Sequence, residues 1–543
     1  MKTNCLKRIF VVMLVVVMVL GLAACGKKDK ETDSEGTVDK SAGNVTYPLS
    51  TDVELSIWCG NQMALATDIS SWEASPFHSG LESLTGVKMN WLWPTKGADI
   101  SQAYNLLWTD YDVPDIIFHN VSNDDAKALL EDGYIYDLTE YLPEYAPNYW
   151  AWLNQPENEA TRKSVQLSDG SYFGVTSMKE DAYSMVWIGP IVRQDWLDEC
   201  GLKAPVTLAE WENVLTTFKD KYGATLSFKI SEVTASGGLA SGTGALGFLD
   251  TADFRVTEDG EVVIPQIADG YKELLEIMVR WWEKGLIDHD SLSMSDDALR
   301  QKALNGKAGI VFASGTGATN IITDAANEKN GANWVGLSYP RTAEGEPTSM
   351  ICHQYGKSTG YHAMISAASS EEELIAALRW LDYGWTEEGM MYWNFGTEGI
   401  SYEFDAEGKP QWAEIVKTDP LGLLEGAKKY RGTGGAAPVL QMRSMAEANN
   451  VSVGIMDSVI ETWMDNTVAD KHMLPSMDME ESDRDTYEQL WSSITTYIDE
   501  ESMKMFTGKT PISQYDAFVK KLYDMGLQDV LDIKQKYYDE YMK

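Results

Sequence analysis

Two glycine-bounded segments have spacings that could support catalysis or phosphate binding. Residues 356–360, Gly-Lys-Ser-Thr-Gly, match the nucleophile elbow of serine hydrolases, which requires a strand before the serine and a helix after it. Residues 361–365 resemble a strand, so Ser358 is not expected to be a nucleophile. The same segment lacks the upstream glycine of a phosphate loop, because position 351 is Ile351. Residues 242–247, Gly-x-Gly-x-x-Gly, follow no clear strand and favour a flexible loop over a dinucleotide site.

Metal and acid–base chemistry are not indicated either. The six histidines form no His-Glu-x-x-His motif, no Cys-x-x-Cys occurs, and no segment matches a calcium-binding EF-hand loop. With 83 acidic residues, pairs of carboxylates in the sequence do not define a glycosidase site, and Glu387 and Glu388 are interpreted as a solvated turn. We therefore predict no metal, no cofactor and no catalytic residue.

Aromatic residues are the more informative signal. The chain has 19 Trp and 26 Tyr, and several stand beside Gly, Asn or Pro at predicted loop edges, as in segments 58–61, 91–94 and 392–396. A flat ring stacks on the C–H face of a pyranose while neighbouring polar groups bind its hydroxyls, which is the usual form of a ligand pocket. Any single ring could instead pack in a core or between lobes, but the set as a whole indicates a sugar site.

The elements that must hold these residues alternate between strand and helix. Residues 53–58, 89–93 and 115–119 are predicted strands, and 64–85 and 101–111 are predicted helices between them. This alternation is typical of an α/β lobe with a largely parallel sheet.

Later segments carry stronger helix signals. Capping boxes at Thr207 with Glu210 and at Ser370 with Glu373 predict two helix starts. Residues 271–284 and most of 484–542 are also predicted helical, with breaks at 508–511 and 526, and sharp turns are predicted at 167–171 and 257–261.

Length and charge restrict the class of protein. A chain of 543 residues exceeds one hydrophobic core, so two or more lobes are expected. The formal charge of −39 argues against nucleic acid and, more weakly, against a polyanionic ligand. Cys59, Cys200 and Cys352 are predicted to be buried thiols, with at most one pair bridged.

The N-terminus carries a targeting signal. A positive head precedes an apolar run over residues 9–22, and residues 22–26, Leu-Ala-Ala-Cys-Gly, resemble a bacterial lipobox. This predicts a signal peptide over 1–24, lipidation of Cys25, a flexible tether over 25–45, and a location on the extracytoplasmic face of the cell membrane. The alternatives are an ordinary signal peptide with a chance cysteine, or an uncleaved anchor.

Several segments together resemble family-1 extracellular solute-binding proteins of ABC importers, and most closely the long lipoproteins for multiple-sugar and oligosaccharide uptake. The segments are 187–197, which contains Arg-x-Asp-Trp-Leu, 201–207, 304–310 with Gly-Lys-Ala-Gly, 394–402 with Gly-x-Glu-Gly-x-x-Tyr, and the last fifty residues. Gly189 and Pro190 depart from the plainer strand that many members have at this crossover.

The resemblance implies an α/β, two-lobe, periplasmic-binding-protein-like fold of type II, with discontinuous lobes and a multi-strand hinge. Lobe one would comprise 46–184 and 338–400, and lobe two 185–337 and 401–543. It also implies a monomeric binding protein that is not an enzyme. Such a protein would close over a carbohydrate and deliver it to separate permease subunits.

Loops at the carboxyl ends of strands are where such sheets bind ligands. The predicted ligand contacts are Trp58, Asn61, His119, Asn120, Trp187, Ser314, Thr316, Trp393 and Glu398. Trp393 is expected on a glycine-flanked loop with Glu398 nearby as a hydroxyl acceptor; alternatively Trp393 plugs the lobe interface and Glu398 caps a helix. Arg193 and Asp195 are expected to be a structural pair.

Two other classes of protein remain open. A lipid-anchored carbohydrate enzyme would need two carboxyl groups at catalytic separation in one cleft. A binding lipoprotein for a non-sugar ligand, or one that serves a sensor, would share most of the same sequence features.

Overall fold

The computed structural model of the chain separates Met1–Gly36 from Thr37–Lys543. It describes residues 40–60, 69, 74–94, 98–109, 113–235, 238–239, 254–328, 331–345, 356–432, 437–451, 454–464 and 472–543. The predicted signal peptide, Cys25 and residues 25–39 of the predicted tether lie outside this set. Within it, no helix has both the length and the apolar character needed to span a bilayer.

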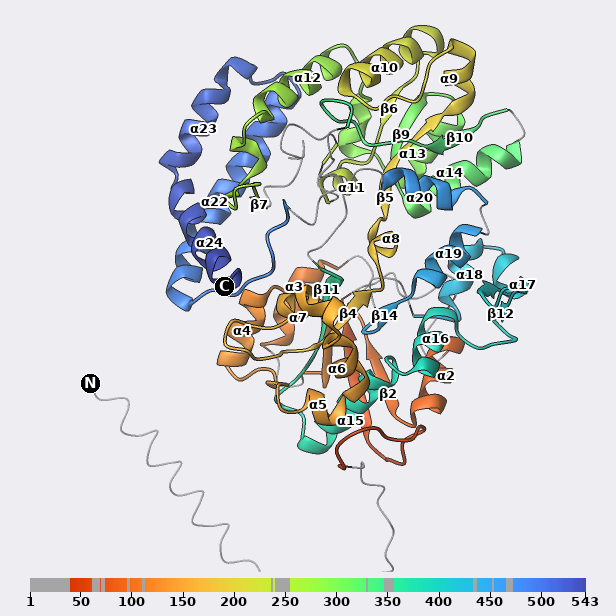
Figure 1. Cartoon of the computed structure of the whole chain (residues 1–543), viewed down its shortest axis with the longest axis vertical. Coiled ribbons are helices and arrows are strands. Elements are labelled where there is room, and N and C mark those ends of the chain that lie inside the picture. The colour runs from red at the N-terminus through yellow and green to blue at the C-terminus, as the bar shows by residue number, and fades with distance from the viewer. Residues whose placement is uncertain are drawn as a thin grey trace, which may run out of the picture. The chain divides into compact units, whose positions relative to one another are not determined.

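The first of two large sheets contains the predicted N-terminal strands (Figure 1). Its strand order is β14-β4-β11-β3-β1-β2, with β1 parallel to both β2 and β3 as predicted. β11 runs antiparallel to β3 and β4, so the sheet is mixed. Its strands are β1 Glu54–Cys59, β2 Lys88–Leu92, β3 Ile116–Asn120, β4 Val175–Lys179, β11 Ser358–Ile365 and β14 Leu440–Gln441.

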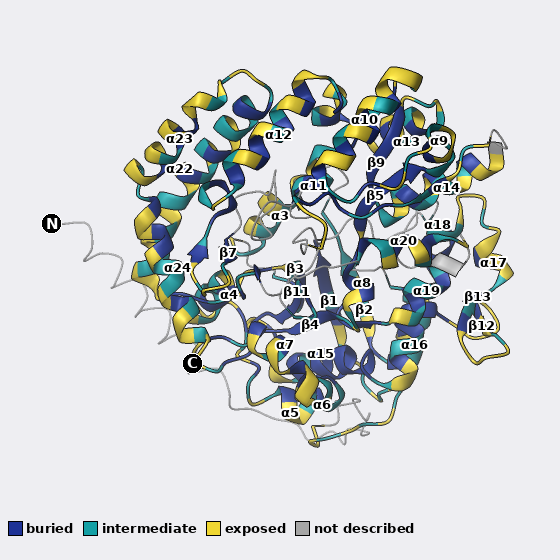
Figure 2. Cartoon of the chain, turned by 45° about the horizontal axis from the view of Figure 1, so that its top comes forward, coloured by how far each residue is buried: buried dark blue, intermediate teal, exposed yellow. Residues whose placement is uncertain are grey.

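Helices from two separate parts of the chain cover this sheet. They are α2 Pro76–Thr85, α3 Ile100–Leu107, α4 Asn123–Glu131, α5 Leu142–Tyr145, α6 Pro147–Leu153, α7 Glu159–Ser164, α15 Glu371–Tyr383 and α16 Glu387–Phe395. The Ser370–Glu373 capping box starts α15 as predicted. Ten consecutive residues of α15 are buried, which makes this helix the centre of the first lobe's core (Figure 2).

The end of the predicted tether is docked on this lobe. The fully buried Arg379 of α15 donates from its guanidinium to the carbonyls of Ser41 (2.6 Å) and Gly43 (2.5 Å). Tyr47 donates its hydroxyl to the carbonyl of Arg379 at 2.7 Å. Residues 40–45 are therefore held by the first lobe, and the prediction of a free tether up to residue 45 is corrected for them.

The second sheet has the strand order β10-β5-β9-β6, with bounds β5 Ile188–Arg193, β6 Thr225–Ser227, β9 Ala308–Ser314 and β10 Trp334–Gly336. The Thr207–Glu210 capping box is confirmed at the start of α10. The turn predicted at 257–261 joins a hairpin, whereas no strand flanks the turn at 167–171. The other elements are α9 Gln194–Cys200, α10 Leu208–Tyr222, α11 Ile230–Ala235, β7 Arg255–Val256, β8 Val262–Val263, α12 Tyr271–Glu283, α13 Asp296–Leu304, α14 Gly315–Glu328 and α20 Met456–Trp463.

Chain crossings between the sheets explain the unusual Gly-Pro pair at 189–190. β4 continues through α8, Ala182–Met185, into β5, and α20 packs directly on β5. A Cβ atom at Gly189 would lie 2.4 Å from the Trp463 ring, and the Trp463 indole N–H donates to the Pro190 carbonyl at 2.8 Å. Glycine is thus required at 189 for close contact between strand and helix.

Residues 401–441 are associated with the first sheet. β14 pairs with β4, and a small module packs around Phe395 and Trp412. The module comprises β12 Tyr402–Phe404, β13 Pro410–Trp412, α17 Glu414–Lys417 and α18 Leu423–Lys428, and α19 Arg443–Val451 follows it. The residue numbers predicted for the lobe boundaries remain a prediction. The pairing of β14 with β4 places residues 440–441, which were predicted to lie in lobe two, in the first sheet.

The C-terminal region is helical as predicted and breaks where predicted. It contains α22 Glu481–Phe506, α23 Tyr515–Asp524 and α24 Leu527–Tyr541. α22 packs against α12 of the second lobe. Just before α22, Asp478 accepts from the backbone and hydroxyl of Ser168 and lies 3.3 Å from Lys127 of α4, so this region also contacts the first lobe.

Candidate functional site

The carboxyl ends of several strands meet along one edge of each sheet. In the first sheet these are the ends of β1, β3 and β4, with the antiparallel start of β11 beside Asn120. In the second sheet, the ends of β6 and β9 lie beside the start of β5, where Ser314 pairs with Ile188. Because β4 leads through α8 directly into β5, the two edges lie on either side of this crossing (Figure 1).

An aromatic group lies at the edge of the first sheet, formed by Trp58, Tyr104, Trp108 and His119. The ring centroids of Trp58 and His119 are 5.5 Å apart, those of Tyr104 and His119 4.4 Å, and those of Tyr104 and Trp108 5.6 Å. β1 supplies Trp58, β3 supplies His119, and α3 with its C-cap supplies the other two. The group therefore joins β1 to the consecutive elements α3 and β3, which lie more than 40 residues later in the chain.

Burial keeps this aromatic group uncharged near neutral pH. Desolvation lowers the pKa of His119, partly opposed by the negative charge of Asp125, so the imidazole is neutral at pH 7. Its Nδ1 is buried and has no hydrogen-bond partner among the described residues. A Cβ at Gly60 would lie 2.4 Å from that nitrogen, so glycine is needed for the ring to pack against the backbone.

The edge of the second sheet carries three of the predicted residues. Trp187 directly precedes β5 and is 39% exposed, unlike most tryptophans of the chain. Its carbonyl accepts from the N–H of Gly315 at 2.6 Å, which brings it beside Ser314 and the exposed Thr316. A cavity begins at Ser314 and is lined further by Glu232, Asp296, Asp297, Arg300 and Asn320.

The structure brings some of the predicted contacts together and separates others. Trp58, His119 and Asn120 gather on the first edge, and Trp187, Ser314 and Thr316 on the second. Asn61 lies outside the described residues. As ligand contacts, all of these remain predictions.

Trp393 is the clear correction. It lies inside α16, which begins at the Thr386 N-cap and ends at Gly396, and not on a loop. The ring is 5% exposed and packs on Phe77 and Trp380, with centroids 5.0 and 5.9 Å away. Trp393 is therefore part of the first lobe's core.

Glu398 and the Glu387–Glu388 pair are also placed differently from expectation. Glu398 is an exposed residue of the turn that follows α16, so it does not share a site with the buried Trp393 ring. Glu387 and Glu388 occupy the exposed first turn of α16, where negative charge favours a helix start. The turn interpretation of this pair was wrong, although the pair is solvated as expected.

The remaining motifs match no catalytic arrangement in the described part of the chain. Ser358 begins strand β11 and accepts a hydrogen bond from the N–H of Gly360 at 3.1 Å, so it is not followed by the helix that an elbow requires. Residues 242–247 and Cys352 lie outside the described residues. Cys59 is buried, Cys200 is partly buried and unbridged, and Arg193 pairs with Asp195 at 2.5 Å.

Sequence reasoning missed Tyr104, Trp108, Glu232 and the Asp296–Asp297 pair. A signal for the first two existed, since they stand four residues apart at the end of a predicted helix and therefore on one face. None of the residues of α3 is fully buried, and Tyr104 and Trp108 pack, partly buried, against the core cluster that contains Trp58. The acidic residues gave no such signal because first-turn acids are common in helices.

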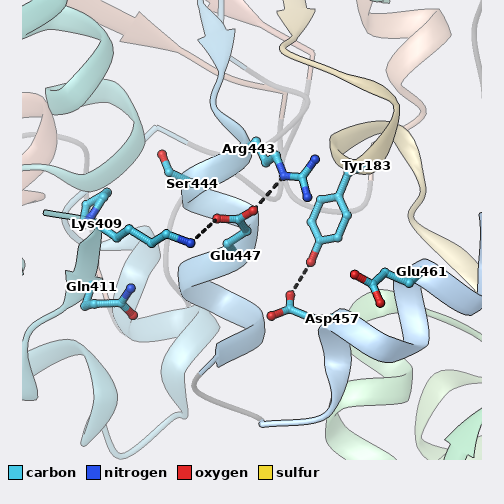
Figure 3. Close-up of a pocket in the computed structure, with 9 residues that line it drawn as sticks. Tyr183, Lys409, Gln411, Arg443, Ser444, Glu447, Asp457 and Glu461 are labelled. Carbon is cyan, nitrogen blue, oxygen red and sulfur yellow. Dashed lines mark hydrogen bonds and ion pairs between the residues drawn. The ribbon is translucent and has the colours of Figure 1, made fainter. Parts of the chain in front are cut away.

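A second cavity lies among the crossing segments, and several of the polar side chains that line it bond one another (Figure 3). Tyr183 of α8 donates its hydroxyl to Asp457 of α20, and Arg443 of α19 donates to Glu447 at 2.7 Å. The Arg443 guanidinium also lies 4.6 Å from the centre of the Tyr183 ring. The contacts of Tyr183 join α8 to α19 and α20, which belong to two segments that pass between the sheets. We therefore interpret the residues around this cavity as stabilising the hinge.

Comparisons with known proteins agree with this architecture. Residues 85–391 match the model of the family described as "Bacterial extracellular solute-binding protein". The fructooligosaccharide ABC transporter substrate-binding protein FusA of Streptococcus pneumoniae serotype 4 is 24% identical, with 96% of each chain covered. Lipoprotein LipO of Bacillus subtilis is 24% identical over 61% of this chain and 64% of its own.

A solved structure shows the same fold. The alginate-binding protein AlgQ2, crystallised without calcium ion, superposes with a TM-score of 0.70 at 19% identity, covering 90% of this chain and 98% of its own. The fold class predicted from sequence, an α/β two-lobe fold of type II, is therefore confirmed.

Proposed function

The chain belongs to the bacterial extracellular solute-binding protein family, and we propose that it captures a carbohydrate, in particular an oligosaccharide, between its lobes and delivers it to an ABC importer. The observation that carries this proposal is the set of partly exposed rings of Tyr104, Trp108 and His119 on the first edge, together with the exposed Trp187 of the second. Trp58 is 5% exposed and is part of the core against which Tyr104 and Trp108 pack. Rings on two walls can stack on successive sugar units, while Asn120, Ser314 and Thr316 offer hydrogen bonds to hydroxyls.

The mechanism is closure of the lobes about their crossings, without making or breaking a bond. Aromatic stacking and desolvated hydrogen bonds provide affinity, and closure excludes water from them. The importer recognises the closed form through both lobes, and its permease and ATPase subunits are separate chains. The binding protein works as a monomer. Its first lobe comprises about residues 46–184 and 338–400 together with strand β14, and its second lobe comprises about residues 185–337 and the rest of 401–543.

Known relatives support the substrate class without deciding the sugar. FusA is named for fructooligosaccharide and AlgQ2 for alginate, so carbohydrate is common to both names. A sensor partner or a non-sugar ligand would leave the same fold, but the paired aromatic walls favour a sugar.

A thermal-shift screen tests this function directly. We expect at least one member of a panel of fructo-, malto-, cello- and galacto-oligosaccharides to raise the melting temperature, because a ligand that binds only the folded state stabilises it. Ligand at a hundredfold excess over its Kd adds about 2.7 kcal/mol. After prolonged incubation, chromatography should recover the sugar intact; catalytic loss would instead assign the protein to the carbohydrate enzymes.

Anchoring is proposed to occur through Cys25. We expect Cys25→Ala to abolish acylation and to leave the protein unprocessed or released into the medium, because alanine has no thiol to carry the lipid that would hold the protein at the membrane. Membrane fractionation and intact mass report the two effects, with Cys59→Ala, which changes a cysteine of the folded body, as the matched control. Unchanged cleavage and membrane association in Cys25→Ala would contradict the lipoprotein assignment.

A further inference from the structure

We propose that a clasp of polar contacts on the ligand-facing edge holds the lobes closed, so that its residues position the two walls around a bound sugar. The clasp joins the first lobe to the segment before α22 and consists of Asp124, Lys127, Ser168, Asp478 and Met479. This inference rests on the proposed function and goes beyond it, because it identifies residues that control closure without touching the ligand.

The contacts of the clasp are short. Asp478 is 3% exposed and accepts hydrogen bonds from the backbone N–H of Ser168 at 2.7 Å and from its hydroxyl at 2.6 Å. The Lys127 ammonium lies 3.3 Å from the same carboxylate. Asp124 accepts from the N–H of Met479 at 2.6 Å. Two segments that are far apart in the chain are therefore joined through carboxylates, of which Asp478 is almost excluded from water.

The two halves of the clasp belong to different cores. α4 and the turn at 167–171 bury Ala126 and Leu167 in a cluster of the first lobe. α22 and α24 bury Ile494 and Leu531 in the large cluster of the second lobe. Figures 1 and 2 both show α24 beside α4. The clasp is therefore a contact between the lobes and not a part of either core.

The position of the clasp determines which movement it opposes. β3 ends at Asn120 and leads directly into α4, and the negative charge of Asp125 in the first turn of α4 acts on His119. The clasp thus lies on the edge of the first sheet that carries the aromatic group. Contacts between the lobes on this edge are lost when the cleft opens, so they stabilise the closed form relative to the open one.

A polar clasp suits a movement that must be reversible. Lys127 has two carboxylate partners across the boundary, Asp478 and Glu480, each at 3.3 Å. The cost of desolvating a buried ion pair largely offsets the attraction between its charges, so the pair adds little net stability. When the lobes part, water solvates both charges again. An apolar contact of the same size would instead expose its surface to water and resist opening.

α22 and α24 add further attraction across the same boundary. Arg484 of α22 donates to the carbonyl of Asp124 at 3.4 Å. The Lys534 ammonium of α24 lies 4.0 Å from the centre of the Tyr487 ring. Desolvation lowers the pKa of Lys534, and the negative charge of Asp124 partly opposes this effect. Burial raises the pKa of Asp124, and the positive charge of Lys534 partly opposes that effect in turn. Each charge therefore favours the other across the boundary.

Hydrogen exchange of the whole chain tests the clasp. The backbone N–H groups of Ser168 and Met479 each donate across the boundary, so their exchange reports closure. The probe is the oligosaccharide of the thermal-shift panel that stabilises the protein most. We expect it to slow exchange at both amides by about fivefold or more, the lower end of usual coupling between sites. The N–H of Gly170, which donates to Leu167 within the first lobe, should not respond. Sugar binding that leaves both interlobe amides unchanged would overturn the inference.

Variants connect the clasp to affinity. Lys127→Met leaves the Asp478 carboxylate buried without its cation only while the clasp is closed. We therefore expect calorimetry to show sugar binding weaker by about fivefold or more, with faster exchange at the two amides. Lys429→Met is the matched control, and it should bind sugar as the wild type does. Lys429 and Asp419 pair beside the module that follows α16, and their side chains are 14% and 7% exposed, compared with 10% and 3% in the clasp.

A double variant separates the lost charge from the lost packing. Asp478→Asn combined with Lys127→Met removes both charges, so the closed clasp holds no uncompensated charge. We expect the double variant to bind sugar more tightly than Lys127→Met alone. If Lys127→Met lost no more affinity than Lys429→Met, the clasp would have no role in closure.

The proposed function and the clasp fail separately. If no sugar of the panel bound the wild type, the proposed function would fail. Faster exchange at Ser168 and Met479 in Lys127→Met than in Lys429→Met would still support the clasp, and equal exchange would refute it.

Discussion

Trp393→Ala should lower the free energy of unfolding by about 3–5 kcal/mol, as expected when a large buried aromatic residue is truncated. The ring is enclosed by Phe77, Trp380 and the backbone at Gly432, where a Cβ would lie 2.4 Å from it. The loss combines lost apolar burial with a cavity that a helix-bound site cannot easily fill. Chemical denaturation of the ligand-free protein measures it.

The same variant should leave sugar affinity unchanged in the fraction that folds. Trp393→Phe serves as the graded control, because it keeps most of the ring volume and removes an indole N–H that has no hydrogen-bond partner in the described structure. We expect its destabilisation to be clearly smaller. Weakened sugar binding at wild-type stability would reverse the placement of Trp393 in the core.

Trp187→Ala should have the opposite profile. We expect sugar affinity to fall by about 2 kcal/mol or more, equivalent to roughly 30-fold, as for aromatic residues that anchor a ligand. The melting temperature without ligand should barely change, because the side chain is 39% exposed before any ligand covers it. Calorimetric titration and ligand-free melting separate the two quantities.

A matched control for Trp187 comes from the module after α16. Phe404 on β12 is 48% exposed, so Phe404→Ala removes a similarly exposed ring far along the chain from both sheet edges. Its affinity should remain that of the wild type. If Trp187→Ala bound sugar as well as Phe404→Ala does, the second edge would lose its aromatic wall.

Local signals in the sequence were sufficient for much of the fold. The predicted strands at 53–58, 89–93 and 115–119 are found within one residue as β1, β2 and β3. Both capping boxes are present, because a cap depends on residues only three positions apart. The antiparallel entry of β11 and the two-residue strand β14 were not predictable in this way, since each depends on a partner far away in the chain.

The sequence indicated which sheet edges carry the candidate site, but not which residues of those edges face a ligand. Strand ends indicated Trp58, His119 and Trp187, yet whether a ring faces a core or a ligand depends on neighbours that meet only in the folded chain. Trp393 shows the difficulty: its flanking glycines suggested a loop, but Gly396 terminates α16 with φ 86°, a conformation that favours glycine. The Thr386 N-cap followed by Glu387 and Glu388 was the available helix signal.

The hydrogen bonds from Arg379 to the carbonyls of Ser41 and Gly43 determine where a pull on the N-terminal anchor would act on the protein. If Cys25 carries the lipid, tension on the anchor enters the body at these carbonyls and passes into α15, the most deeply buried helix of the first lobe. Gly43 and Leu49 add backbone bonds to Glu144 and Thr85, which spread that load within the same lobe. These contacts all lie within the first lobe, so an anchor at Cys25 would be fixed to that lobe and not to the crossing from β4 through α8 to β5.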